Sequence, residues 1–213
     1  CKPQIIGRIQ HYISRKALDI EGLGQETVAL LVNANLIKNY SDLYELKFDQ
    51  IVGLERMAEK SANNLITGII DSKNIPFERV LYGLGIRYVG ETVAKKLAKH
   101  FENIDNILNS DFDELISVDE IGEKIANSII EFSQNSENVE IINSLKSHNI
   151  QFEIDDSNKN VSSILVGKSF VISGVFANFS RDELKKLIES NGGKISSSIS
   201  SKTTYLVAGS NMG

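Results

Sequence analysis

The sequence predicts a mainly helical protein, in which a tandem array of short helical hairpins is followed by a small α/β domain. The first observation is an apolar template that recurs four times, at spacings of 34, 32 and 32 residues. A fixed period of this size is typical of an array built from one supersecondary unit. The second observation is a polar stretch near residue 155, after which short β-type runs surround one helical pattern. The chain therefore divides into a helical part and an α/β part.

Composition is consistent with two soluble domains. The 213 residues are long for a single domain, and 41% of them are hydrophobic, which provides material for a sizeable core. The single cysteine excludes a disulfide framework and fits a reducing compartment. The sequence contains no apolar run long enough to span a bilayer and no signal-peptide pattern. We therefore expect a cytoplasmic protein.

The charge distribution excludes nucleic-acid binding through a basic tail. The net charge is −5. Residues 1–152 carry 16 basic and 22 acidic residues, a net of −6, and residues 153–158 add −3. Residues 159–213 carry 7 basic and 3 acidic residues, a net of +4. A chain with this balance can bind DNA only through a few placed cations and oriented backbone amides.

Four repeat units are expected after a lead-in helix. Residues 1–17 form the lead-in, since apolar side chains recur there at helical spacing, and the array occupies residues 18–154. Each unit is predicted to be a helix, a tight turn and a second helix, centred on Gly24, Ala58, Gly90 and Gly122. Counted from each centre, the shared positions are −6 (Leu18, Val52, Leu84, Ile116), −4 (Ile20, Leu54, Ile86, Val118), −1 (Leu23, Met57, Val89, Ile121), a small residue at +4 (Val28, Ala62, Ala94, Ala126) and +7 (Leu31, Leu65, Leu97, Ile129).

This unit has the shape of a helix-hairpin-helix, a module that offers backbone amides to phosphates. Glycine at the turn exit is expected to tolerate a positive φ and to let another backbone approach closely. The second helix begins there, so its unpaired N–H groups and its positive dipole end face outward as an anion site. A single turn of this kind is more often only a glycine turn in a helical core. Four in register, two of them flanked by cations, favour phosphate binding.

The hairpins differ in their glycines. The first, Gly22-Leu23-Gly24, is the fullest version, and the third and fourth keep only the second glycine. The second, Arg56-Met57-Ala58, has lost both and is predicted to be structural. On this reasoning Gly90→Val should damage its hairpin more than Ala58→Val, because the turn at Ala58 already accepts a side chain.

The hairpins also differ in flanking charge. Basic residues gather around the third hairpin, which also has Thr92 near its exit, at Arg79, Arg87, Lys95, Lys96 and Lys99. The first has Arg15 and Lys16 upstream, and the fourth lies in an acidic stretch relieved only by Lys124. The candidate DNA-binding residues are Arg15, Gly22, Leu23, Gly24, Thr27, Lys60, Arg87, Val89, Gly90, Thr92, Lys95, Gly122 and Lys124.

A further helix is expected from about Glu137 to Ser147, and residues 155–163 are predicted to be a linker. Residues 164–213 then show a β-α-β-β pattern. Strands are expected near 169–172, 194–199 and 204–208, and Ser180 to Glu183 form a capping box that opens the helix. A parallel strand pair covered by one helix is incomplete, so we expect this domain to be truncated at Gly213.

The sequence shows no catalytic constellation. Gly167-Lys168-Ser169 looks like the end of a P-loop, but Ser162 stands where that loop needs glycine. His11, His100 and His148 are isolated, and no residues have metal-ligand spacing. Two other functions stay open: a non-enzymatic DNA-binding scaffold in DNA repair, and a protein-binding helical solenoid. The solenoid needs bulky aromatic residues at set positions, and the chain has no tryptophan.

The stretch from Gly7 to Gly24 resembles a signature of bacterial NAD-dependent DNA ligases, at the point where their zinc finger passes into a helix-hairpin-helix domain. Two later stretches, Gly53–Met57 and Leu81–Gly90, agree with it. The tail, with Ser173-Gly174, Gly192-Gly193-Lys194 and Thr203–Gly209, resembles the BRCT domain of those ligases. The resemblance covers essentially the whole chain.

The resemblance implies a DNA-binding C-terminal portion of a ligase that seals nicks in DNA replication and repair. Four hairpins would grip nicked duplex DNA from the minor-groove side. Adenylation of a lysine from NAD, and AMP transfer to the 5′-phosphate, would belong to N-terminal catalytic domains outside this sequence, so this portion alone should be inactive. Cys1 would be the fourth zinc ligand of the parent. NAD, Mg and Zn are implied for that parent, and no cofactor within this portion. Ser173 is expected to serve a turn rather than a phosphopeptide.

Overall fold

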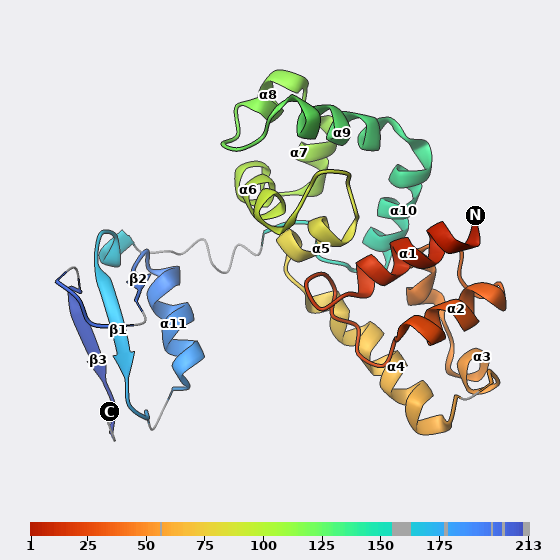
Figure 1. Ribbon diagram of the computed structural model, residues 1–213, viewed down its shortest axis with the longest axis horizontal. Helices are drawn as coiled ribbons and strands as arrows, with labels where there is room; N and C mark the ends of the chain where they lie inside the picture. Colours follow the sequence, from red (N-terminus) through yellow and green to blue (C-terminus); the bar gives the residue numbers. More distant parts are fainter. Residues whose placement is uncertain (56, 155–162, 177–178, 197, 202, 211–213) are drawn as a thin grey trace. The chain divides into compact units, whose positions relative to one another are not determined.

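A computed structural model describes residues 1–55, 57–154, 163–176, 179–196, 198–201 and 203–210 (Figure 1). The chain forms two compact units, Cys1–Ile154 and Asp155–Gly213. The first is helical and the second contains a small parallel sheet, which confirms the predicted fold class. Most of the predicted linker lies outside the described residues, and its last residue, Ser163, opens a short 3₁₀ helix, η4 (Ser163–Leu165). No described helix has the length and apolarity needed to cross a membrane.

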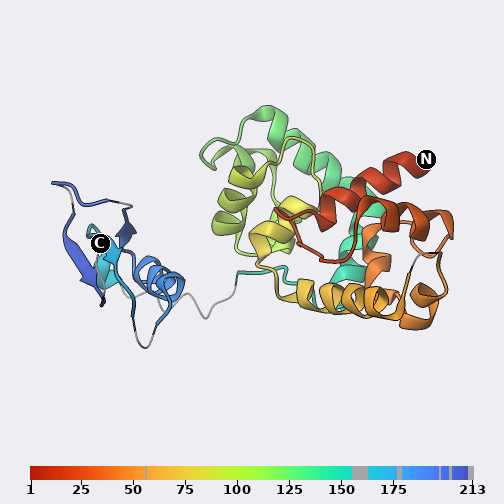
Figure 2. The same cartoon turned by 60° about the horizontal axis from the view of Figure 1, so that its bottom comes forward.

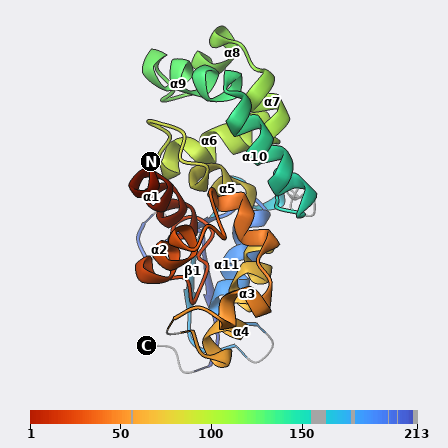
Figure 3. The same cartoon turned by 90° about the vertical axis from the view of Figure 1, so that its right-hand side faces the viewer.

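The first unit contains four helical hairpins. In each, a first helix packs on a second across a tight turn: α1 on α2, α3 on α4, α5 on α6 and α8 on α9. Figures 1 and 3 show α9 beside α7 and α10, which complete this end of the unit. The helices are α1 (Lys2–Ile13), α2 (Gln25–Asn33), η1 (Tyr40–Glu45), α3 (Phe48–Val52), α4 (Glu59–Asp71), η2 (Ser72–Asn74), α5 (Phe77–Gly83), α6 (Glu91–Phe101), α7 (Ile104–Asn109), α8 (Phe112–Ile116), α9 (Glu123–Gln134) and α10 (Ser136–Ser147).

Helix α1 is the first helix of the first hairpin rather than a separate lead-in. It packs on α2 and α5 within the same compact unit. The reason is the apolar face formed by Ile9, Tyr12 and Ile13, which is buried in the common core. The structure therefore shows no boundary at residue 17. The helix predicted from about Glu137 is confirmed as α10.

The apolar template corresponds to the core, with two departures. Every residue at positions +4 and +7 is buried. In the second hairpin Val52, Leu54 and Met57 are only half-buried. In the fourth hairpin Ile116 is 41% exposed, so the template position −6 is not a core position there.

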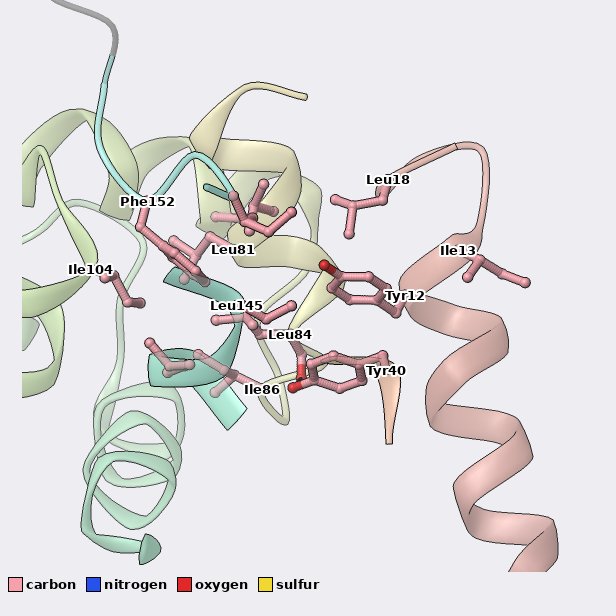
Figure 4. Close-up of a cluster of buried hydrophobic side chains, with 14 of the residues drawn as sticks. Tyr12, Ile13, Leu18, Tyr40, Leu81, Leu84, Ile86, Ile104, Leu145 and Phe152 are labelled. Carbon is pink, nitrogen blue, oxygen red and sulfur yellow. Dashed lines mark hydrogen bonds between the residues drawn. The ribbon is translucent and has the colours of Figure 1, made fainter. Parts of the chain in front are cut away.

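A cluster of buried tyrosines joins the first hairpin to η1. Figure 4 shows the Tyr12 and Tyr40 rings among aliphatic side chains, and the rings stack with centroids 4.4 Å apart. The Tyr12 and Tyr44 hydroxyls share a hydrogen bond of 3.0 Å, and the Tyr44 hydroxyl lies 3.0 Å from Ser72 Oγ. Burial raises the pKa of Tyr40 to about 12 and the pKa of Tyr12 well above its usual value. The core therefore holds these phenols in the neutral form.

We expect the free energy of unfolding to fall as pH rises above about 10, the pKa of an unperturbed tyrosine. Between this value and about 12, the unfolded chain loses protons that folded Tyr40 keeps, so alkali favours unfolding. Denaturant unfolding at a series of alkaline pH values measures the decline. Tyr40→Phe should make it shallower. A stability that is unchanged up to pH 12 would contradict this account.

The second unit is built on a three-stranded sheet. Strand β1 (Ser169–Ser173) lies between β2 (Lys194–Ile195) and β3 (Tyr205–Ala208), and both pairings are parallel. Helix α11 (Arg181–Ser190) packs on β1 and β2. Its predicted capping box is confirmed, because Glu183 N donates to Ser180 Oγ at 3.2 Å and Ser180 N donates to Glu183 Oε2 at 2.6 Å.

Two details of the second unit differ from or add to the sequence prediction. The strand expected over 194–199 is described only as far as Ile195. Ser173 ends β1, and Gly174 follows with φ +93°, which places Ser173 beside the turn predicted for it. A Cβ on Gly174 would lie 2.8 Å from the Ser210 carbonyl oxygen, so this turn requires glycine.

Candidate nucleic-acid interface

The four hairpin exits share one backbone geometry. Gly24, Ala58, Gly90 and Gly122 are the N-caps of α2, α4, α6 and α9, with φ between −74° and −92° and extended ψ. Each cap carbonyl accepts the first intrahelical hydrogen bond, at 2.9–3.1 Å. None of these four helices has a side-chain cap. Their first N–H groups are therefore available to an anion.

One of the two reasons for expecting glycine at these exits, the tolerance of a positive φ, is wrong for the centre glycines. The centre glycines have negative φ, and the positive φ lies two residues earlier, at Gly22 (+80°), Tyr88 (+66°) and Glu120 (+65°). The corresponding Arg56 lies outside the described residues. The tight turn itself imposes this conformation, whereas the N-cap residue is extended, which any residue adopts.

The centre glycines instead leave open space. A Cβ on Gly24, Gly90 or Gly122 would meet no atom within 4 Å. The structure therefore gives no steric reason for Gly90→Val to damage its hairpin more than Ala58→Val, because Gly90 has a negative φ and a Cβ there would meet no atom within 4 Å. What a side chain there would obstruct is the approach of a ligand to the first-turn amides.

The first hairpin is supported by the second. A Cβ on Gly22 would lie 3.4 Å from Leu65 N, and a Cβ on Gly68 would lie 2.6 Å from the Glu21 carbonyl oxygen. Figures 1 and 2 show α4 (orange to gold) beside the loop that follows α1. The second hairpin was predicted to be structural, and its α4 backbone contacts the turn of the first hairpin. Gly68 was missed in the sequence, although a glycine inside a helical pattern signals close backbone approach.

Cations of the first and third hairpins meet in one cavity of about 520 Å³. We call this the cation pocket, lined by Arg15, Lys16, Glu78, Arg79, Tyr82, Glu91 and Lys95. Arg79 Nη2 donates to the Arg15 carbonyl at 2.6 Å, which ties α5 to the loop after α1. Lys16 Nζ lies 2.7 Å from Glu91 Oε1, and this hydrogen bond raises the pKa of Lys16. Four cations face two carboxylates, so the pocket carries net positive charge.

Lys96, on α6 of the third hairpin, pairs with acids of the fourth hairpin and does not line the pocket. Its Nζ lies 2.7 Å from Asp119 Oδ2 and 3.0 Å from Glu120 Oε2. The hydrogen bond with Asp119, followed by that with Glu120, raises the pKa of Lys96, and the same pair lowers the pKa of Asp119. Two of the acids that flank the fourth hairpin are thus partly neutralised by a lysine of the third.

The other predicted DNA-binding residues do not line the cation pocket. Leu23 and Val89 are buried, so only their backbone can face a ligand. Thr27, Lys60, Thr92 and Lys124 lie in the first turns of α2, α4, α6 and α9, each beside its own hairpin exit. The Arg87 guanidinium carbon lies 4.8 Å from the centroid of the exposed Tyr88 ring. The pocket residues Glu78, Tyr82 and Glu91 were missed, because contacts between hairpins leave no periodic signal.

Cys1 is the N-cap of α1 and carries a free, exposed thiol. Among the described residues, no group of three or more His, Cys, Asp or Glu side chains could hold a metal ion. Cys1 therefore has no metal-ligating partners within the described part of the chain.

Comparison with known proteins gives matches over both units. A family model described as helix-hairpin-helix motif matches residues 79–142, and one described as BRCA1 C Terminus (BRCT) domain matches residues 160–213. Curated proteins named DNA ligase from Flavobacterium psychrophilum, Flavobacterium johnsoniae and Christiangramia forsetii are each 64% identical over 214 residues, which covers all of this chain. The chain spans 32% of the length of each of these relatives.

Proposed function

The chain is homologous along its whole length to one part of bacterial DNA ligases, and from this we propose that it holds nicked duplex DNA as the C-terminal portion of such an enzyme. The observation that carries the proposal is the cation pocket. It joins Arg15 and Lys16 of the first hairpin to Arg79 and Lys95 of the third. Two hairpins of this type, with cations between them, suit a ligand that carries regularly spaced phosphates.

Each hairpin exit supplies two attractions for a phosphate oxygen. The N–H groups of the first helical turn can donate hydrogen bonds, and the positive end of the helix dipole favours the anion. Gly24 and Gly90 leave room for the phosphate to approach these amides. The amides and cations contact the backbone rather than base edges, so binding should not depend on sequence.

The hairpins contribute unequally in this proposal. The first and third combine an open glycine exit with the cations of the pocket. The second has alanine at its exit, and its α4 supports the first hairpin. The fourth has an open exit at Gly122, but Asp119, Glu120 and Glu123 lie beside it. Only part of the array is therefore proposed to bind DNA tightly.

Neighbouring lysines on α6 provide the test. For the unmodified chain we expect the logarithm of duplex affinity to fall with the logarithm of salt concentration at a slope of about −2.7 to −4.5, from about three to five phosphates at about −0.9 each. Lys95→Ala should make the slope shallower by about 0.9, since Lys95 lines the pocket. Lys96→Ala should leave the slope unchanged, because Lys96 is paired with Asp119 and Glu120.

Fluorescence anisotropy of a labelled nicked duplex over a range of salt concentrations measures both slopes. Equal slopes for the two variants would contradict the assignment of the pocket. No measurable duplex affinity for the unmodified chain at low salt would contradict DNA binding altogether, and it would favour the protein-binding alternative.

The activity of the whole protein is part of the same proposal. In this proposal, N-terminal domains of the parent protein use NAD to adenylate a lysine and then transfer the AMP to the 5′-phosphate of the nick in the presence of Mg. The sealing reaction would serve DNA replication and repair in the cytoplasm. The chain itself lacks a K-x-D-G motif, so we expect it to be inactive alone. One exposed thiol at Cys1 fits a single position of a four-cysteine zinc site, and we propose that three other cysteines of the parent complete it.

A further inference from the structure

Tyr88 adopts a backbone conformation that its residue type disfavours. Positive φ is found at six non-glycine residues in the described part of the chain. Three of them are aspartate or asparagine, the types that tolerate this conformation best. Tyr88, at φ +66°, is the aromatic member of the set. The equivalent position in the first hairpin is Gly22, which adopts φ +80° without the steric cost that a Cβ imposes.

The Tyr88 ring contributes little to the core that could offset this cost. Tyr88 is 53% exposed, although its neighbour Val89 is 6% exposed and packs inside. The contact described for the ring is with Arg87, whose guanidinium carbon lies 4.8 Å from the ring centroid. Two residues further on, Gly90 opens α6 with free space around it. The turn thus presents an aromatic ring and a cation next to an anion site.

We propose that Tyr88 is a DNA-contacting residue, whose ring packs against the deoxyribose of a nucleotide adjoining the phosphate at the start of α6. The bases of a duplex are covered by their stacked neighbours, whereas the sugar is accessible and is the same in every nucleotide, so this contact carries no sequence preference. Arg87 stacks on the tyrosine and places a positive charge beside the ring. This inference rests on the proposed function, because it names a new contact for the same hairpin.

The experiment distinguishes the effect of the Tyr88 ring on DNA affinity from its effect on the stability of the fold. Tyr88→Gly removes the ring and also relieves the disfavoured φ, so the melting temperature should be unchanged or higher. Duplex affinity should nevertheless fall by at least about fivefold, since tyrosine is among the residues whose truncation weakens an interface most. The ring is neutral, so the loss should be the same at every salt concentration and the salt slope should not change. Tyr88→Phe should bind as the unmodified chain does.

Glu120→Gly is the matched control, because Glu120 has φ +65° at the same position of the fourth hairpin. It should lose no duplex affinity, because it removes no aromatic contact and takes away a carboxylate that pairs with Lys96. If the unmodified chain binds duplex DNA and Tyr88→Gly binds equally well, the inference is wrong while the proposed function stands. If the unmodified chain does not bind at all, the proposed function itself fails. If Tyr88→Gly lowers the melting temperature, Tyr88→Asn replaces it, since asparagine tolerates positive φ, and equal affinity of that variant would overturn the inference.

Discussion

Replacing Gly68 with alanine is expected to lower the free energy of unfolding by about 2–3 kcal/mol, the upper part of the usual range for overpacking. The added Cβ would lie 2.6 Å from the Glu21 carbonyl oxygen and 3.2 Å from Glu21 N. Both are backbone atoms, so no flexible side chain can give way. Either α4 or the turn of the first hairpin must move. Urea unfolding followed by circular dichroism measures the change.

Gly7→Ala is the control for this substitution, because Gly7 also lies within a helix, α1, and a Cβ there would meet nothing within 4 Å. It should raise the free energy of unfolding by about 0.5–1 kcal/mol, since alanine is the better helix former. The two substitutions are chemically identical and should have opposite effects. A Gly68→Ala variant as stable as Gly7→Ala would show that α4 does not support the first hairpin.

Gly90→Val is expected to lower duplex affinity by at least about tenfold, because hydrogen bonds to charged groups contribute about 1.5–3 kcal/mol and valine would block the approach to them. The fold should tolerate the change. Gly90 has φ −83° and extended ψ, which suit a β-branched residue, and no atom lies within 4 Å of its Cβ position. Anisotropy with a labelled duplex measures the affinity, and thermal unfolding confirms that the variant folds.

Ala58→Val provides the comparison at the second hairpin. Ala58 has φ −74° at the same N-cap position, and its exit already carries a side chain. We expect this variant to keep both its stability and its duplex affinity. An affinity loss comparable to that of Gly90→Val would mean that the second hairpin also contacts DNA.

The sequence predicted those parts of the fold that depend on contacts within a hairpin. The small residues at position +4 and the aliphatic ones at position +7 lie on the second helix of each unit, which packs on the first, and all of them are buried. The capping box at Ser180 and Glu183 is likewise a local arrangement. Such contacts repeat at a fixed spacing in the chain, so a pattern can reveal them.

Contacts between hairpins could not be predicted in the same way. Lys95 and Lys96 are adjacent in a basic cluster, but α6 directs one to the cation pocket and the other to Asp119 and Glu120. The partner that each lysine contacts depends on how the hairpins pack against one another, and the spacing of residues in the sequence does not reveal this packing. The close approach of Gly68 to Glu21 has the same origin.

The positions of positive φ in the turns were predicted wrongly for a different reason. Glycine at a turn suggests positive φ, and the pattern offered two glycines only in the first hairpin. In the structure, Tyr88 and Glu120 adopt the positive φ, while Gly90 and Gly122 are extended. Glycine is thus present at the exit for the space that it leaves rather than for the conformation that it permits.

The claim that the hairpins bind DNA unequally is tested most directly by comparing Gly90→Val with Gly122→Val on one nicked duplex. The two glycines have φ −83° and −92°, and neither has an atom within 4 Å of its Cβ position, so valine should disturb both folds equally little. We predict an affinity loss of at least about tenfold for Gly90→Val and less than about twofold for Gly122→Val, because of these two hairpins only the third is proposed to donate hydrogen bonds to a phosphate. Equal losses, or no loss for Gly90→Val, would contradict the account.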